Sequence, residues 1–255
     1  MSNEQTIEKK TFEVTKELID KLVNLINEKK VVEINTTLHA LHPSDAAEVL
    51  SNIPEKARFN LLLLEALDLR PDTVKELNNA LQKDILNQLP SDNVAEIVNQ
   101  LESDDALQIV SNLNEEKKID VYEKIPLQDK KLLEEVLKAY PEDSAARIMQ
   151  TEYCSVSPEW TVGETIDYLR DTDDLPKEFL QIFIVDEKNR PLGSVPSSRI
   201  LRNPRSVKMK DIMDETQMLI YGDWDKEHVG YLFEQYNLIT AGVVDKNNKL
   251  IGMIT

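Results

Sequence analysis

Cysteine, histidine and long apolar runs are scarce in this chain of 255 residues. The single cysteine, Cys154, excludes a disulfide within the chain and is typical of a reducing compartment. With only three histidines, and no clustered spacing among them, a zinc site is not expected, because zinc prefers imidazole and thiolate ligands. No stretch approaches the roughly 18 apolar residues that a membrane-spanning helix needs. Met1–Lys10 is polar and lacks the apolar core of a signal peptide, so we expect the chain itself to be cytosolic.

Catalytic motifs are missing as well. The sequence has no glycine-rich phosphate loop, no GxSxG or HExxH motif, and no Cys or Ser with an evident His partner. Cys154 is interpreted as a small buried apolar residue. We therefore predict that the chain is not an enzyme, and we assign no catalytic residue.

Acidic residues outnumber basic ones by 47 to 30, which gives a formal net charge of −17 at pH 7. This excess repels nucleic-acid phosphates and anionic membrane surfaces, because phosphate binding relies on Lys and Arg. It favours cations instead, and abundant carboxylates suit hard cations such as Mg²⁺ or Ca²⁺. A solvated acidic surface that keeps the protein dissolved is the simpler alternative. We expect no nucleic-acid partner.

The first part of the chain, residues 12 to about 140, is expected to be helical throughout. Glycine is absent from it, and apolar residues recur at steps of three and four, as in Leu18, Leu22 and Ile26. Three short motifs place a serine before acidic residues, a pattern that predicts a serine N-cap followed by an acidic first turn; these serines are Ser44, Ser91 and Ser103. Short helices joined in this way predict a right-angled bundle or a small superhelix.

The second part contains all six glycines and an internal duplication. Residues 179–186 predict a buried strand, 187–190 a turn and 191–195 a returning strand. Residues 184–193 match residues 243–252, and Ile148-Met149 with Trp160 recurs as Ile212-Met213 with Trp224. Each copy of about 60 residues would bury little apolar surface alone, so we expect the two copies to pack against each other.

This duplication resembles a tandem pair of CBS domains (cystathionine-β-synthase-type modules). The residues before it narrow the resemblance. His42–Leu50 (HPSDAAEVL) is similar to the opening of the helical N domain of MgtE-type magnesium transporters, and Tyr140–Met149 (YPEDSAARIM) resembles that family's junction with its first CBS domain. The resemblance implies an α+β chain of two parts: an all-helical superhelical N domain over 1–140, then a CBS pair over 141–204 and 205–255, the second CBS domain lacking its last helix.

The same resemblance implies a function. The chain would be the Mg²⁺-sensing regulatory region of a magnesium transporter, a homodimer on the cytoplasmic face of the membrane that compacts when Mg²⁺ binds. Its partner would be its own transmembrane domain, whose pore it gates.

The acidic cluster of residues 223–227 is the densest candidate for a metal site. It begins like an EF-hand loop, but His228 stands where that loop needs glycine, which rules the EF-hand out. A helix N-terminus is the structural alternative, because Asp225 and Glu227 would then oppose the helix dipole. The resemblance to MgtE transporters implies Mg²⁺ ligands from the Asp225 and Glu227 carboxylates, the main-chain carbonyls of Glu234 and Arg147, and the N-domain residues Glu76 and Asp104. Gln108 and Asn237 depart from aspartates of the family's pattern, so sites that use them should be weaker or differently formed.

Two other functions stay open. CBS pairs bind adenine nucleotides in many proteins, but Arg199 occupies the acidic position of the usual ribose-binding pattern, so at most weak nucleotide binding is expected and no cofactor-binding residue is assigned. The helical part is also similar to the repeats of flagellar motor switch proteins, so the chain could instead be a protein-docking scaffold.

Overall fold

The computed structural model describes residues 13–126, 135–172, 175–176, 178–215 and 217–255. The chain divides into two compact units. The first comprises the described residues up to Leu101 together with Ile109–Ile125, and the second comprises Glu102–Gln108, Pro126 and the described residues from 135 onward. Helix α8 (Ser103–Asn112) contributes to both units.

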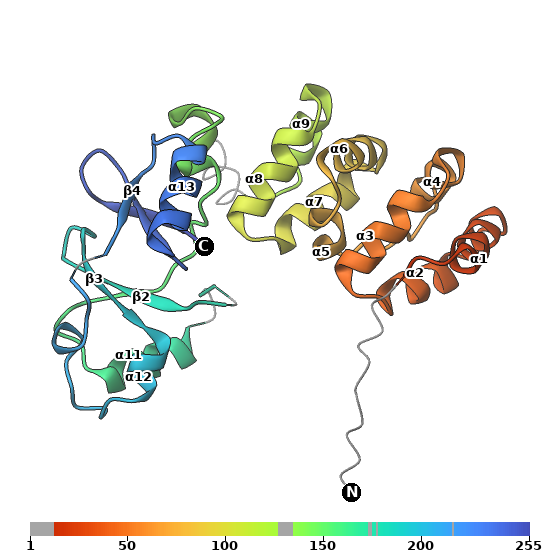
Figure 1. Cartoon of the computed structure of the whole chain (residues 1–255). Helices are drawn as coiled ribbons and strands as arrows, with labels where there is room; N and C mark the ends of the chain where they lie inside the picture. Colours follow the sequence, from red (N-terminus) through yellow and green to blue (C-terminus); the bar gives the residue numbers. More distant parts are fainter. Residues whose placement is uncertain (1–12, 127–134, 173–174, 177, 216) are drawn as a thin grey trace, which may run out of the picture. The chain divides into compact units, whose positions relative to one another are not determined.

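The first unit is a stack of short helices (Figure 1). They are α1 (Lys16–Asn27), α2 (Val31–His39), α3 (Pro43–Asn52), α4 (Glu55–Leu62), α5 (Pro71–Lys75), α6 (Asn79–Gln88), α7 (Ser91–Gln100) and α9 (Glu115–Tyr122), with the end of α8. Alternate helices pack on one another, α3 on α5, α5 on α7, and α7 on α9, which is the arrangement of a superhelix. Their inward faces form a core of Leu, Ile, Val and Ala, in agreement with the predicted helical period.

The predicted serine N-caps are wrong, although the acidic first turns are confirmed. Ser44 is the second residue of α3, and the preceding His42 caps that helix through its ring Nδ1. Ser91 and Ser103 are the first residues of α7 and α8. In α3 and α7 the proline explains the shift, because Pro43 fits the first helical position and Pro90 holds the extended conformation of a cap residue. The serine hydroxyls instead donate to acidic side chains, Ser44 to Glu76 (3.2 Å) and Ser103 to Glu152 (2.8 Å).

The second unit contains two modules with the same sheet topology. In the first module, β1 (Ser155–Val156) pairs in parallel with β2 (Gln181–Val185), and β2 pairs antiparallel with β3 (Pro191–Pro196). In the second, β4 (Leu219–Tyr221), β5 (Ala241–Val244) and β6 (Leu250–Ile254) repeat this order and these directions. Helices α11 (Val162–Asp171) and α13 (Lys226–Tyr236) occupy equivalent places, and α12 (Ser197–Leu201) follows β3. The predicted duplication and its hairpins are confirmed.

Each module is completed by the segment that precedes the other one. The 3₁₀ turn η2 (Met209–Asp211) leads into the second module, yet Met209 lies fully buried in the core of the first. The turn η1 (Ala145–Arg147) leads into the first module, yet it packs on β4 of the second. Short pairings continue this exchange, Gln150 with Met253 and Asp214 with Ser194. Neither module's core is closed by its own contiguous sequence.

The hairpin turns of the two modules are built alike. Asp186 accepts the backbone N–H groups of Lys188 and Arg190, and Asp245 accepts the equivalent groups of Asn247 and Lys249. The residue that reverses the chain is an asparagine in each, Asn189 with φ 59° and Asn248 with φ 58°. Asparagine tolerates this left-handed conformation better than other residues with a Cβ atom, so the sequence repeat reflects a backbone requirement.

No helix in the described ranges combines the length and the apolar content needed to cross a membrane.

Candidate functional site

Asp104 lies in the first turn of α8, in an environment that disfavours its charge. Burial raises the pKa of its carboxyl to about 6, and the neighbouring charges of Asp105 and Glu102 add to that effect. Its Oδ1 atom is buried and, among the described residues, accepts no hydrogen bond. A buried carboxylate oxygen without a donor is costly for the fold. An incoming cation would relieve that cost.

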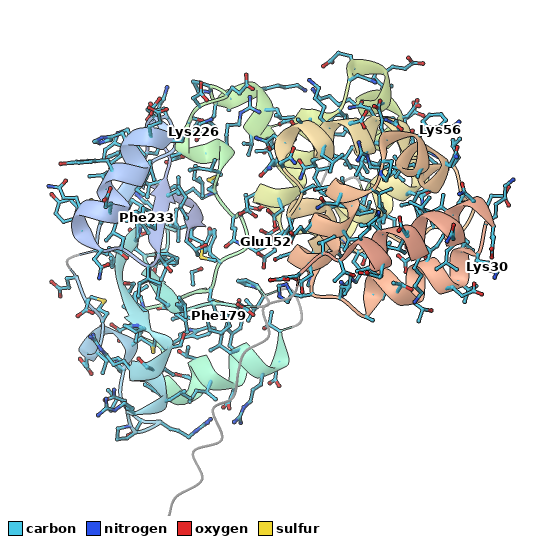
Figure 2. All side chains as sticks on the ribbon, turned by 45° about the vertical axis from the view of Figure 1, so that its right-hand side comes forward. Lys30, Lys56, Glu152, Phe179, Lys226 and Phe233 are labelled. Carbon is cyan, nitrogen blue, oxygen red and sulfur yellow. The ribbon has the colours of Figure 1, made fainter. Side chains whose placement is uncertain are left out.

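The segment before β1 is fastened to this turn by several hydrogen bonds. The backbone N–H and the hydroxyl of Ser103 donate to Glu152 Oε2 (3.3 and 2.8 Å), and the N–H of Thr151 donates to Ser103 Oγ (2.8 Å). Gln150 Nε2 donates to Glu102 Oε2 (2.5 Å). Figure 2 labels Glu152 on this segment. Glu102 and Glu152 were not predicted as site residues, because the contacts join residues nearly fifty positions apart (|i−j| of 48 and 49).

Asp225 is the N-cap of α13. Its Oδ1 accepts the backbone N–H groups of Glu227 (2.8 Å) and His228 (3.3 Å), as the helix-terminus alternative predicts. Lys226, labelled in Figure 2, forms an ion pair with Asp143 (2.6 Å). Its carboxylate neighbour raises the pKa of Lys226. In the part of the chain that the structure describes, no Lys, Arg or His side chain lies within ion-pair distance of Asp225 or Glu227.

The other predicted ligands occupy separate places. Glu76 follows α5 in the first unit and accepts the Ser44 hydroxyl. The main-chain carbonyl of Glu234 accepts a long hydrogen bond from the N–H of Asn237 (3.4 Å). Asn237 ends α13 with φ 49°, a conformation that explains an asparagine at this position.

Arg147 lies in the turn η1. Its side chain donates to the carbonyls of Tyr140 (3.1 Å) and Leu137 (2.9 Å). Leu137 lies in the helical residues 135–139.

Within the described ranges, no three His, Cys, Asp or Glu side chains gather closely enough to hold a metal ion by themselves. The predicted set is therefore not a preformed protein cage. Magnesium is compatible with such partial sites, because it keeps several of its waters and uses one or two carboxylates. Cys154 is buried in the core of the first module, and burial raises the pKa of its thiol to about 11, which confirms it as an apolar core residue.

Arg199, the residue that departs from the nucleotide-binding pattern, is held in place by the protein. Its guanidinium donates to the carbonyl of Ile212 (2.8 Å) and pairs with Asp214 (3.0 Å). It therefore connects α12 to the segment that leads into the second module.

A helical domain followed by two βαβ modules that exchange segments defines a class of proteins, those in which a helical domain precedes CBS domains. The family model of the MgtE intracellular N domain matches residues 41–143, and the family model of the CBS domain matches residues 145–206. The magnesium transporter MgtE of Bacillus subtilis is 25% identical over 239 residues, which cover 94% of this chain and 53% of the transporter. MgtE of Thermus thermophilus is 34% identical over 123 residues, 48% of this chain and 27% of that protein. The chain thus contains an MgtE N domain and a CBS domain and is homologous to MgtE magnesium transporters, which are not enzymes.

Two solved structures share the fold. The crystal structure of "the soluble part of a magnesium transporter" aligns with a TM-score of 0.76 and 21% identity, covering 94% of both chains. The cytosolic domain of the Mg²⁺ channel MgtE in complex with ATP aligns with a TM-score of 0.81 and 23% identity, covering 93% of this chain and 97% of that one. The chain spans about half the length of the Bacillus transporter and about a quarter of the Thermus one.

Proposed function

We propose that this chain is the Mg²⁺-responsive regulatory region of a magnesium transporter on the cytoplasmic face of the membrane. It compacts when Mg²⁺ binds, and in this way it controls the pore of a transmembrane domain in the same protein. The homology to MgtE transporters supports the context, and the acidity of the chain supports the ion. The observation that carries the proposal is the buried, unpaired Oδ1 atom of Asp104.

The physical basis is a balance between repulsion and bridging. Without divalent cations, carboxylates that face one another repel, and Asp104 bears its charge in a partly buried place. A Mg²⁺ ion that reaches such carboxylates offsets the repulsion. Mg²⁺ can shift the equilibrium between the open and the compact form only if it binds the compact form more tightly. Carboxylates that approach one another in the compact form, and share one ion, would supply this difference in affinity.

The proposed ligands are the Asp225, Glu227, Glu76 and Asp104 carboxylates and the main-chain carbonyls of Glu234 and Arg147. Because the described carboxylates do not form a preformed cage, water completes the octahedron of each ion. The chain is further proposed to act as a homodimer.

Small-angle X-ray scattering tests the proposal. The radius of gyration should fall in millimolar MgCl₂ and stay constant in NaCl of equal ionic strength. If the two salts act alike, the sensor function is wrong and the protein-docking scaffold is favoured. Sedimentation of the same samples measures whether the chain dimerises.

Substitutions at Asp225 separate its two roles. Asp225→Ser keeps an N-cap but removes the carboxylate, whereas Asp225→Ala removes both. If Asp225 is a ligand, both variants should lose part of the Mg²⁺ response. If it is only a cap, Asp225→Ser should respond like the wild type, and Asp225→Ala should be less stable by about 1 kcal/mol.

Adenine nucleotide is a second candidate ligand, since the structural neighbour described above was solved with ATP. Here the anchored Arg199 offers a positive charge to phosphate where an acidic residue would hold ribose. Isothermal titration with ATP, with and without Arg199→Ala, tests this candidate. Heat of binding that Arg199→Ala abolishes would support it.

A further inference from the structure

Helix α8 is held by hydrogen bonds at both ends, and its two ends belong to different units. At its C-terminal end, the Asn87 side chain donates to the carbonyl of Asn112 (3.2 Å) and accepts the N–H of Asn114 (2.9 Å). The Asn112 side chain donates to the buried Gln82 (2.7 Å). Gln82 and Asn87 lie on α6, so this end of α8 is fixed within the first unit.

The start of α8 is fixed within the second unit. Glu152 accepts both the backbone N–H and the hydroxyl of Ser103, and that hydroxyl also accepts the N–H of Thr151. Ser103 is the first residue of the helix, so its N–H has no acceptor inside α8, and Glu152 supplies one. Gln150 donates to Glu102 beside it. We call these five residues the α8 latch.

The latch is in turn connected to β6. The backbones of Gln150 and Met253 exchange two hydrogen bonds, each of 2.8 Å. The Tyr153 hydroxyl donates to the carbonyl of Leu250 (3.1 Å). Met253 and Leu250 are both buried, so the segment that holds the start of α8 is itself anchored in the core of the second module.

The α8 latch needs no metal ion, because the chain supplies every donor and acceptor in these bonds. Its five residues are half-buried, and the bonds that Glu152 accepts are of the charge-assisted kind, which are stronger than neutral ones. The neighbouring Asp104 differs, since its Oδ1 accepts no hydrogen bond among the described residues. The first turn of α8 therefore combines a fastening that is already complete with a carboxylate that is not.

We propose that the α8 latch is a cation-independent fastening of the compact form, and that its strength sets the Mg²⁺ concentration at which the chain responds. This inference rests on the proposed function and adds to it a positioning residue, Ser103, which binds no ion. Because the latch already favours the compact form, Mg²⁺ has to supply only the remainder of the free energy of compaction. Since α8 is one continuous helix, the latch acts on the first unit through the helix itself.

Small-angle X-ray scattering of Ser103→Ala over a series of MgCl₂ concentrations tests the latch. The Mg²⁺ concentration at the midpoint of compaction should rise about fivefold, the effect of about one net hydrogen bond. At saturating Mg²⁺ the radius of gyration should equal that of the wild type. Ser103→Thr keeps a hydroxyl and should restore the wild-type midpoint. Combined with Glu152→Ala, the shift should be smaller than the sum of the two single shifts, because both changes remove the same contact.

Ser91→Ala is the matched control. Ser91 is also the first residue of its helix, α7, and donates to a carboxylate, that of Asp120 (3.5 Å), but both partners lie in the first unit. Its midpoint should equal that of the wild type. A wild-type midpoint in Ser103→Ala would overturn the proposal, as would an equal shift in Ser91→Ala.

The same measurements separate failure of the latch from failure of the proposed function. If Mg²⁺ does not compact the wild type, the proposed function fails, and the radii of gyration in NaCl then decide on the latch. A larger radius for Ser103→Ala than for the wild type and Ser91→Ala would support it as a fastening. Equal radii in all three proteins would overturn it.

Discussion

Leu250 and Asn189 are joined by two reciprocal hydrogen bonds across the two modules. The backbone N–H of Leu250 donates to the carbonyl of Asn189 (2.8 Å), and the Asn189 side chain donates to the carbonyl of Leu250 (2.9 Å). The Asn189 side chain also donates to the Tyr153 hydroxyl (3.0 Å). Asn189 therefore forms the hairpin turn of its own module and fixes the position of the other.

Asn189→Ala should lower the free energy of unfolding by about 2 kcal/mol, because it removes two hydrogen bonds and strains a left-handed backbone. Asn189→Gly removes the bonds without that strain and should cost less. Asn248→Ala is the control, since the exposed Asn248 side chain accepts the Tyr221 hydroxyl (3.0 Å) and, among the described residues, has no hydrogen bond to the other module. Urea unfolding measures all three. Equal losses for Asn189→Ala and Asn248→Ala would contradict the role given to Asn189.

Gly252→Ala should be strongly destabilising. A Cβ atom at this position would lie 2.5 Å from the Gln150 carbonyl oxygen and 2.8 Å from Met149 Sδ, so the exchanged segment would have to move. A loss of about 2 kcal/mol or more is expected in the free energy of unfolding. Gly230→Ala is the opposite case, because it lies exposed in α13 with nothing within 4 Å of an added Cβ atom. Gly230→Ala should raise the free energy of unfolding by about 0.5–1 kcal/mol. A lower free energy of unfolding would show that another part of the protein contacts α13 at this position.

Asp104→Asn should raise the thermal midpoint in Mg²⁺-free buffer, because it removes a charge that burial disfavours. The expected gain is about 1 kcal/mol after allowance for partial solvent exposure, or roughly 2–4 °C. The same variant should lose much of the stabilisation that MgCl₂ gives to the wild type. Asp20→Asn, on the exposed side of α1, removes an equal charge and serves as the control. A midpoint that falls in Mg²⁺-free buffer would show that the Asp104 charge is stabilised rather than frustrated.

The stability of the chain should depend on pH through Glu159, whose carboxylate is bound by two lysines. Hydrogen bonds from Lys208 and Lys210 lower the pKa of Glu159 from its ordinary value of 4.5 to about 2. Their contribution to stability is therefore complete above pH 4.5 and is lost as the pH falls toward 2. Unfolding of the wild type and of Glu159→Gln at low salt should differ slightly at neutral pH and converge near pH 2. Glu187→Gln, in an exposed turn, should match the wild type throughout, and a difference that persists unchanged at pH 2 would refute the assignment.

The sequence was sufficient for elements whose signal is local. The helical period around Leu22 and Ile26, the buried strand before Asp186 and the repeated turns at Asn189 and Asn248 each depend on neighbouring residues. The serine caps failed because a proline one position earlier controls where α3 and α7 begin. The exchange of segments between the modules could not be predicted, because it depends on contacts such as Gln150 with Met253, which no local pattern encodes.

In the candidate site, too, only the residues with a local sequence signal could be predicted. Asp225 stood out because acidic residues cluster around it, and the structure places it at a helix N-terminus as expected. The partners of the α8 turn, Glu102 and Glu152, gave no signal, since the backbone brings them together from distant positions. The ligand roles of Asp225, Glu227, Glu234, Glu76, Asp104 and Arg147 remain predictions.

The exchange of segments between the modules also affects how the chain withstands cleavage. A protease cut in residues 202–206 would break the polypeptide but would leave Met209 in the core of the first module and Ala145 hydrogen-bonded to the second. The two fragments would stay associated and would migrate as a single species in size-exclusion chromatography, because each fragment supplies a segment that packs on the other module. A gene that encoded one module alone would lack part of the core that this module requires.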